Sequence, residues 1–101
     1  MKCDETDPEA VVDETMVVAA RAVSIPYRTA TTSNHRKATK ARAITMVWAT
    51  FEVGHTLEDV ADALGMDHST VAHHRGKHDK RLQDDRMYRQ AWDELVGQLK
   101  E

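Results

Sequence analysis

The sequence predicts an all-α protein: a small helical bundle that forms one domain. The chain has 101 residues, of which 41% are hydrophobic and 31% charged, as is typical of a globular domain. Only 5% of the residues are aromatic, and four glycines and two prolines provide few turns for an all-β fold. Apolar residues recur every three or four positions through most of the chain, which is the period of amphipathic helices.

The composition also argues against several classes of protein. Cys3 is the one cysteine, so neither an internal disulfide nor a four-cysteine zinc site can form within one chain. No apolar run approaches the roughly 18–20 residues of a membrane span, and no secretory signal is recognisable. The glycines are too widely spaced for a loop that binds nucleotide phosphates. We therefore expect a cytoplasmic protein without enzymatic activity, cofactor, metal or membrane contact.

The N-terminal third is predicted to contain a tail and one helix. Residues 1–8 read as an acidic flexible tail, and residues 9–101 as the helical domain. The sequence Asp7-Pro8-Glu9 is typical of a helix start, since Asp caps free amide groups and Pro suits the first turn. The helix should end before Pro26. The residues it should bury are Val12, Met16, Ala20 and Val23.

The middle of the chain is predicted to contain loops and a second long helix. Residues 24–34 are turn-like, with a short helical turn at 27–30, and residues 34–40 form a polar, basic loop. A helix then runs from about Thr39 to Val53, and Gly54 ends it. Its apolar face comprises Ile44, Val47, Trp48 and Phe51.

Three more helices are predicted in the C-terminal half. Thr56 begins a short helix with a sequence like a capping box, and Gly65 ends it. A long helix runs from His68 to about Leu82, with Gly76 as a weak point. The last helix covers about residues 85–100. Its apolar stripe contains Tyr88, Trp92, Leu95, Val96 and Leu99, which in so short a chain favours a core face over a dimer interface.

Residues of about 56–82 fit a helix-turn-helix. This motif requires a small residue where its two helices cross, a turn residue that tolerates positive φ, and apolar anchors on each helix. Ala61 and Gly65 meet the first two requirements. The anchors are Val60, Leu64 and Val71. The second helix would present short or polar side chains to a major groove. These are Asp67, His68, Ser69, Ala72, His73 and Arg75.

The net charge of −3 hides a partition along the chain. Six of the 17 acids lie within the first fourteen residues, and no acid occurs between Thr15 and Phe51. The cations of that acid-free stretch are Arg21, Arg28, Arg36, Lys37, Lys40 and Arg42. A second basic-leaning stretch covers residues 75–89. Since the local field rather than the net charge steers a polyanion, these stretches suit a nucleic acid.

Residues 67–73, with the sequence DHSTVAH, resemble the D-H-S/T-T-V-x-H signature of the C-terminal DNA-binding domain of DnaA, the bacterial replication initiator. Residues 42–46 are similar to the R-Q-I-A-M helix of that family, residues 36–40 stand at its basic loop, and residues 21–25 resemble its Y-G-V-S-V segment. The resemblance covers about residues 16–80. The chain differs at Asn34, where the family has an arginine, at Thr50, where a cation is usual, and in a turn one residue shorter.

The resemblance implies sequence-specific binding of double-stranded DNA. Asp67, His68, Ser69 and Thr70 would read bases in the major groove, Arg42 would contact the duplex, and the basic loop would reach the minor groove. With the neighbouring polar groups, the candidate DNA-binding residues are Arg36, Lys37, Lys40, Arg42, Asp67, His68, Ser69, Thr70, His73 and Arg75. A role in replication or transcription regulation follows, in a bacterial cytoplasm and encoded by the cell, a phage or a plasmid. These 101 residues contain no recognisable ATPase module, so we expect a DNA-binding domain and not an initiator.

Three alternatives stay open at this stage. The same helical fold serves protein-interaction modules and adaptors of phage packaging or transposition. A protein partner or a second copy of the chain could bind through the helix at 88–99. His74 and His78 stand four residues apart, as zinc ligands on one helix face do, but no H-E-x-x-H arrangement accompanies them.

Overall fold

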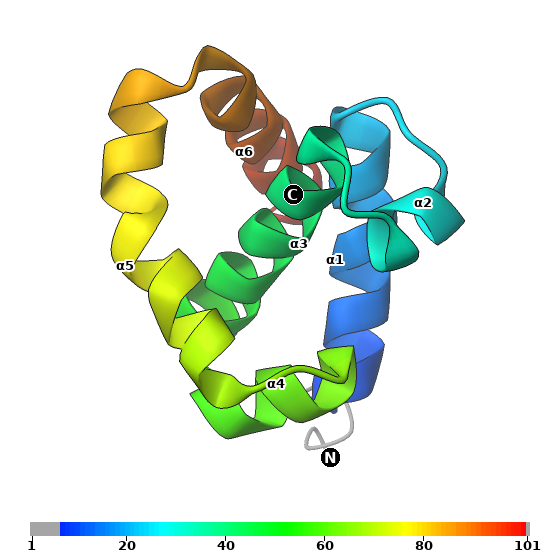
Figure 1. Ribbon diagram of the computed structural model, residues 1–101, viewed down its shortest axis with the longest axis vertical. Coiled ribbons are helices and arrows are strands. Elements are labelled where there is room, and N and C mark those ends of the chain that lie inside the picture. Colours follow the sequence, from blue (N-terminus) through cyan, green and yellow to red (C-terminus); the bar gives the residue numbers. More distant parts are fainter. Residues whose placement is uncertain (1–6, 101) are drawn as a thin grey trace.

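The computed structural model describes residues 7–100, which form helices joined by short turns and contain no strand (Figure 1). This confirms the all-α class. The elements are α1 (Pro8–Ala22), α2 (Tyr27–Thr32), α3 (Arg36–Val47), the π-helical turn η2 (Trp48–Val53), α4 (Leu57–Leu64), α5 (His68–Asp84) and α6 (Arg86–Leu99).

Helix α1 begins as its sequence predicts. The Asp7 carboxylate accepts a hydrogen bond from the Glu9 amide at 3.2 Å, and Pro8 occupies the first turn. The four residues predicted to face inward are all buried. The helix includes Pro8, which the sequence assigned to the tail, and the remainder of that predicted tail, residues 1–6, lies outside the described residues.

Helix α3 begins earlier than predicted. The basic loop expected over residues 34–40 is wrong from residue 36 onward, because the His35 ring caps a helix that starts at Arg36. Its Nδ1 accepts a hydrogen bond from the Lys37 amide at 3.2 Å. Ala38, in the expected loop, is fully buried. Histidine is a weak sequence signal for a helix start, and Ser, Thr, Asp and Asn are the usual caps.

The second half of the predicted long helix is a π-helical turn. A π-helix has more residues per turn than an α-helix, so it rotates later side chains off the face that the 3.6-residue period assigns to them. Phe51 was expected beside Ile44 on the buried face, but 52% of its surface is exposed. Gly54 ends the turn with φ +96°, as predicted.

Helices α4 and α5 are joined by a three-residue turn. Thr56 caps α4 by accepting a hydrogen bond from the Asp59 amide at 3.1 Å. Gly65 ends α4 with φ +69°, a conformation that favours glycine. Val60 and Ala61 of α4 pack with Val71 of α5 in one buried cluster. Helix α5 continues through Gly76 without interruption.

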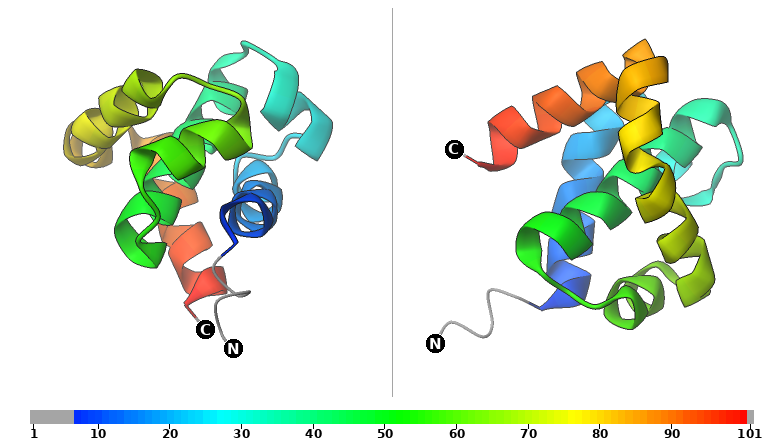
Figure 2. Two further views of the ribbon diagram at one scale, coloured as in Figure 1. Left: turned by 90° about the horizontal axis from the view of Figure 1, so that it is seen from below. Right: turned by 90° about the vertical axis from the view of Figure 1, so that its left-hand side faces the viewer.

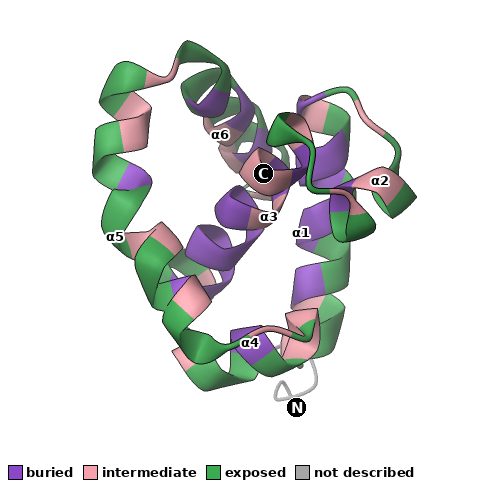
Figure 3. Ribbon diagram, in the orientation of Figure 1, coloured by how far each residue is buried: buried purple, intermediate pink, exposed green. Residues whose placement is uncertain are grey.

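The core lies where α1, α3 and α6 meet. Helix α3 runs between α1 and α5, and the buried residues of Figure 3 line the faces that these helices turn toward one another (Figures 1, 2 and 3). In α6, Tyr88 and Leu95 are buried, and the other apolar residues of its stripe are partly buried against the same core. The stripe is therefore a core face, as the sequence favoured. Within residues 7–100 no helix combines the length and the apolar character needed to cross a membrane.

Candidate nucleic-acid interface

The first turn of α5 carries exposed polar groups. Asp67 stands at the position before the helix, but its carboxylate does not accept a hydrogen bond from a backbone amide of the first turn. It accepts one instead from the Ser69 hydroxyl at 3.1 Å, and the His68 Nδ1 lies 3.5 Å from its other oxygen. Asp67, His68 and Ser69 are exposed, while Thr70 is half-buried. This end of α5 therefore offers hydrogen-bonding groups to a partner.

The next turn of α5 divides its candidate residues between two faces. His73 is exposed, and its ring lies 5.4 Å from that of His74. Arg75 turns the other way, and its guanidinium lies 4.2 Å from the centre of the Phe51 ring. The Nε of Arg75 is buried without a hydrogen-bond partner. Arg75 thus packs on η2 and does not share a face with His73.

Arg42 lies inside the fold rather than on an open surface. Its Nη1 donates a 2.7 Å hydrogen bond to the carbonyl oxygen of Ala30, the buried residue of α2. The side chain is half-buried, and this burial lowers the pKa of Arg42 from its ordinary value. The guanidinium therefore holds α2 against α3.

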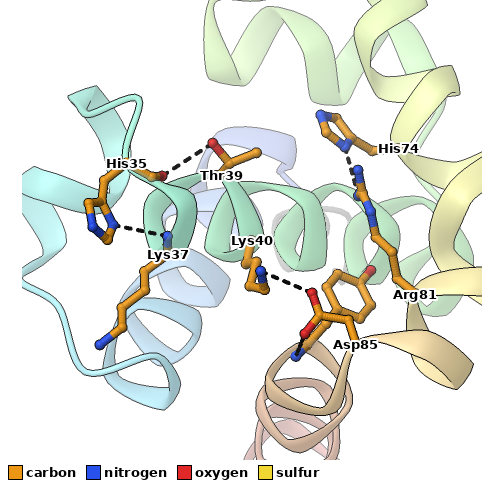
Figure 4. A network of polar contacts seen from close by, with 8 residues as sticks. His35, Lys37, Thr39, Lys40, His74, Arg81 and Asp85 are labelled. Atoms are coloured by element: carbon orange, nitrogen blue, oxygen red, sulfur yellow. Dashed lines mark hydrogen bonds and ion pairs between the residues drawn. The ribbon is translucent and has the colours of Figure 1, made fainter.

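Lys40 is also occupied by a partner within the chain. Its Nζ lies 2.9 Å from one carboxylate oxygen of Asp85, and the other oxygen accepts a hydrogen bond from the Tyr88 amide at 3.1 Å (Figure 4). Burial alone would raise the pKa of Asp85, but the hydrogen bonds from Lys40 and the backbone outweigh it and hold that pKa below its usual value. Asp85 thus caps α6 and ties it to α3.

Arg36 and Lys37 stand at the start of α3. Arg36 is exposed and Lys37 half-buried, and both line a hollow with His35 and Met87. None of the ion pairs formed among residues 7–100 involves either cation. Of the four cations predicted in this region, these two are therefore the ones placed to meet a partner directly.

Arg81 is a functional candidate that the sequence analysis did not single out. Its Nη1 donates to Nδ1 of His74 at 2.9 Å, and its guanidinium lies 5.8 Å from the centre of the Tyr88 ring. Burial, and then the charges of Arg81, His73 and Arg42, lower the pKa of His74 to about 4, so its ring is neutral near pH 7 and can accept this bond. Arg81 belongs to the basic stretch at 75–89, but only the packing of α5 on α3 brings it near Lys40.

His78 has different contact partners from His74. Its ring is buried, its Nδ1 lies 2.8 Å from the Tyr88 hydroxyl, and its centre lies 4.5 Å from that of the Trp92 ring. The two histidines therefore belong to different contacts, one with Arg81 and the other with the aromatic core. Residues 7–100 contain no group of three or more side chains arranged to hold a metal ion.

Acidic side chains gather at the opposite end of α5 from Arg81. Asp7 and Glu9 of the α1 start line one hollow together with Asp59 and Asp62 of α4. Figure 1 shows α5 running from the α4 end of the molecule to the α6 end. The acidic hollow thus lies at the α4 end of α5, with the exposed polar turn of α5 near it and Arg81 at the other end.

The described side chains thus combine hydrogen-bonding groups on the first turn of α5 with cations where α3 faces the junction of α5 and α6. Comparison of the chain with models of protein families, with curated proteins and with solved structures found no match in any of the three.

Proposed function

We propose that this chain binds double-stranded DNA sequence-specifically through a helix-turn-helix formed by α4 and α5. The observation that carries the proposal is the three-residue turn at Gly65, which leads directly into a helix whose first residues are polar and exposed. In a helix-turn-helix the second helix enters the major groove with its N-terminal residues against the base edges. Helix α5 is then the recognition helix.

The chemistry of the first turn of α5 suits base edges. The Asp67 carboxylate accepts a hydrogen bond from a cytosine amino group, and the hydroxyls of Ser69 and Thr70 donate or accept. His68 adds a ring that donates to a base or to a phosphate. The Ser69 hydroxyl already bonds to Asp67, so the two side chains are held in one arrangement before DNA arrives.

The cations divide into two roles under this proposal. Arg36 and Lys37 contact the phosphate backbone. Each phosphate that they neutralise contributes about −0.9 to the slope of log affinity against log salt concentration. Lys40 and Arg42 also hold helices together, because Asp85 and the Ala30 carbonyl already engage them. Arg75 keeps η2 against α5 through Phe51. His73, exposed on α5, is a further groove contact.

The biological role proposed is regulation of replication or transcription. It rests on the resemblance of residues 67–73 to the signature of the DnaA C-terminal domain and on the same polar turn of α5. A bacterial cytoplasm is the compartment that this role requires, whether a bacterium, a phage or a plasmid encodes the chain.

Selection from a random duplex library tests the proposal. The wild-type chain should enrich one common motif, and the double variant His68→Ala/Ser69→Ala should enrich none, while remaining folded by circular dichroism. The matched control is Gln90→Ala, an exposed position on α6. Enrichment by wild type and double variant of the same motif would show that another surface reads the sequence. No binding of any duplex at low salt would overturn the proposal and direct attention to protein partners.

A further inference from the structure

A cationic pocket of about 220 Å³ lies between the first half of α3 and the junction of α5 and α6. Its lining residues are Arg36, Thr39, Lys40, Arg81 and Asp85. Figure 4 shows the last four of them. Three of them are cations, one is a hydroxyl and one is a carboxylate, so positive charge is in excess. Two helices, α3 and α5, and the residue that caps α6 contribute to this lining.

Two of the three cations are held in place before any ligand arrives. Arg81 donates to the neutral ring of His74 at 2.9 Å, and Lys40 meets Asp85 at 2.9 Å. Both side chains are half-buried, and Lys40 exposes only 15% of its side chain. Cations held in this way lose less conformational entropy when they bind an anion than flexible surface lysines do.

Asp85 sets the charge of the pocket. One of its oxygens pairs with Lys40, and the other is engaged by the Tyr88 amide of α6. Its carboxylate neutralises one of the three cations, and an incoming anion must compete with it for Lys40. A guanidinium binds a phosphate with two parallel hydrogen bonds, and Arg36 and Arg81 present two such groups here.

We propose that this pocket binds a phosphate of the DNA backbone and that Asp85 weakens this contact while capping α6. The inference rests on the proposed function and adds a backbone contact at the C-terminal part of α5. From Asp67 to Arg81 the chain advances 14 residues, so the pocket lies about 21 Å along α5 from the base-reading turn.

The acidic end of the molecule favours the same placement. Asp59 and Asp62 of α4, with Asp7 and Glu9, repel a backbone beyond the start of α5. These carboxylates therefore disfavour a DNA backbone at the α4 end of α5 and not at the pocket. The backbone contact and the base-reading turn together fix the direction of the DNA on the protein.

Removal of the Asp85 charge is the sharpest test. Asparagine also caps helices well, so Asp85→Asn keeps the α6 cap while it releases Lys40. Duplex binding by fluorescence anisotropy at several salt concentrations should then be severalfold tighter at low salt, with a log–log slope steeper by about 0.9. Arg81→Gln should weaken binding and make the slope shallower by about 0.9. Arg89→Gln, with the same charge change on α6 in a different hollow, should differ from wild type by less than twofold.

Backbone substitution locates the contact. Neutral methylphosphonates are placed one at a time along a duplex that wild type binds, and one position outside the base contacts should cost affinity. That cost should vanish in Arg81→Gln. Thermal unfolding checks that each variant is folded. If Arg81→Gln does not fold, Arg81→Lys is measured in its place, and because it keeps the charge it should retain the wild-type salt slope.

The outcomes separate the two proposals. Unchanged binding and salt slope in folded Asp85→Asn and Arg81→Gln would overturn the pocket and leave the helix-turn-helix proposal standing. A methylphosphonate cost that persists in Arg81→Gln would also overturn it. Wild type that binds no duplex at low salt would overturn both. A rise in melting temperature with inorganic phosphate, relative to chloride at equal ionic strength, would in that last case identify an anion pocket unrelated to DNA.

Discussion

The guanidinium of Arg42 donates to the carbonyl oxygen of Ala30 at 2.7 Å, so an arginine at a predicted DNA-contact position joins α2 to α3. The α2 helix has six residues, and Ala30 is its buried residue. Loss of Arg42 would therefore loosen α2, which precedes the start of α3 at Arg36. A binding defect in an Arg42 variant is thus compatible with a structural role.

Arg42→Met should lower the free energy of unfolding by about 1.5–3 kcal/mol, the range for hydrogen bonds made by charged groups. Arg36→Met, on the exposed first turn of the same helix, should change it by less than about 0.5 kcal/mol. Urea denaturation followed by circular dichroism measures both. Equal effects at the two positions would show that the Ala30 contact contributes little.

The two glycines of the α4–α5 region should respond to alanine with opposite signs. Gly65 has φ +69° with nothing within 4 Å of an added Cβ, so Gly65→Ala costs backbone strain alone, about 1–2 kcal/mol. Gly76 lies inside α5 with the same open space, so Gly76→Ala should stabilise the protein by about 0.8–1 kcal/mol. Thermal unfolding of both variants should show melting temperatures on opposite sides of wild type.

The hydroxyl of Tyr88 should matter more than that of Tyr27. Tyr88→Phe removes the partner of buried His78, which then keeps an unsatisfied ring nitrogen, at a cost of about 1–3 kcal/mol. The matched change Tyr27→Phe removes an exposed 3.3 Å bond to Asp13 and should cost less than about 0.5 kcal/mol. Urea unfolding compares them, and a cost at Tyr27 as large as that at Tyr88 would contradict the assignment.

Acid should destabilise the fold through His74. Its pKa is about 4 in the folded chain against an ordinary 6.5, so below pH 6.5 the unfolded chain binds more protons than the folded one. Stability is therefore complete above that pH and falls as the pH drops from about 6.5 toward 4. Burial lowers the pKa of His78 as well, in the same direction.

The size of this loss should be about 1 kcal/mol between pH 7 and pH 5, after discounting for the solvent around a half-buried ring. Urea unfolding at several pH values should show it, and the loss should shrink in His74→Gln. A histidine NMR titration gives the pKa directly. A His74 that titrates near 6.5 would refute the expected pH dependence.

Local sequence signals predicted most of the helical elements. The caps at Asp7 and Thr56 and the glycines at 54 and 65 mark helix ends because each acts on its own backbone, and the structure has them in those roles. The start of α3 was missed because a histidine caps it. Phe51 was misplaced because a π-helical turn changes the period of the face on which the prediction relied.

The candidate site was predictable only in part. The first turn of α5 is exposed, as its polar sequence indicates. The start of a helix depends on residues that are neighbours in the sequence, so it can be predicted locally. The engagement of Lys40 by Asp85 and of Arg75 by Phe51 depends on residues 45 and 24 positions away in the chain. Such pairs follow from the packing of helices, which periodicity and charge patterns do not specify.

Helix α1 packs against α2, α3, η2, α4 and α6, and it shares its main core with the last helix of the domain. During translation, Met16 is therefore made 79 residues before its core partner Leu95. At about 5–20 residues per second, the apolar face of α1 waits about 4–16 s for that partner. The nascent domain cannot complete its core until α6 has left the ribosome, so part of the apolar face of α1 stays uncovered during this interval.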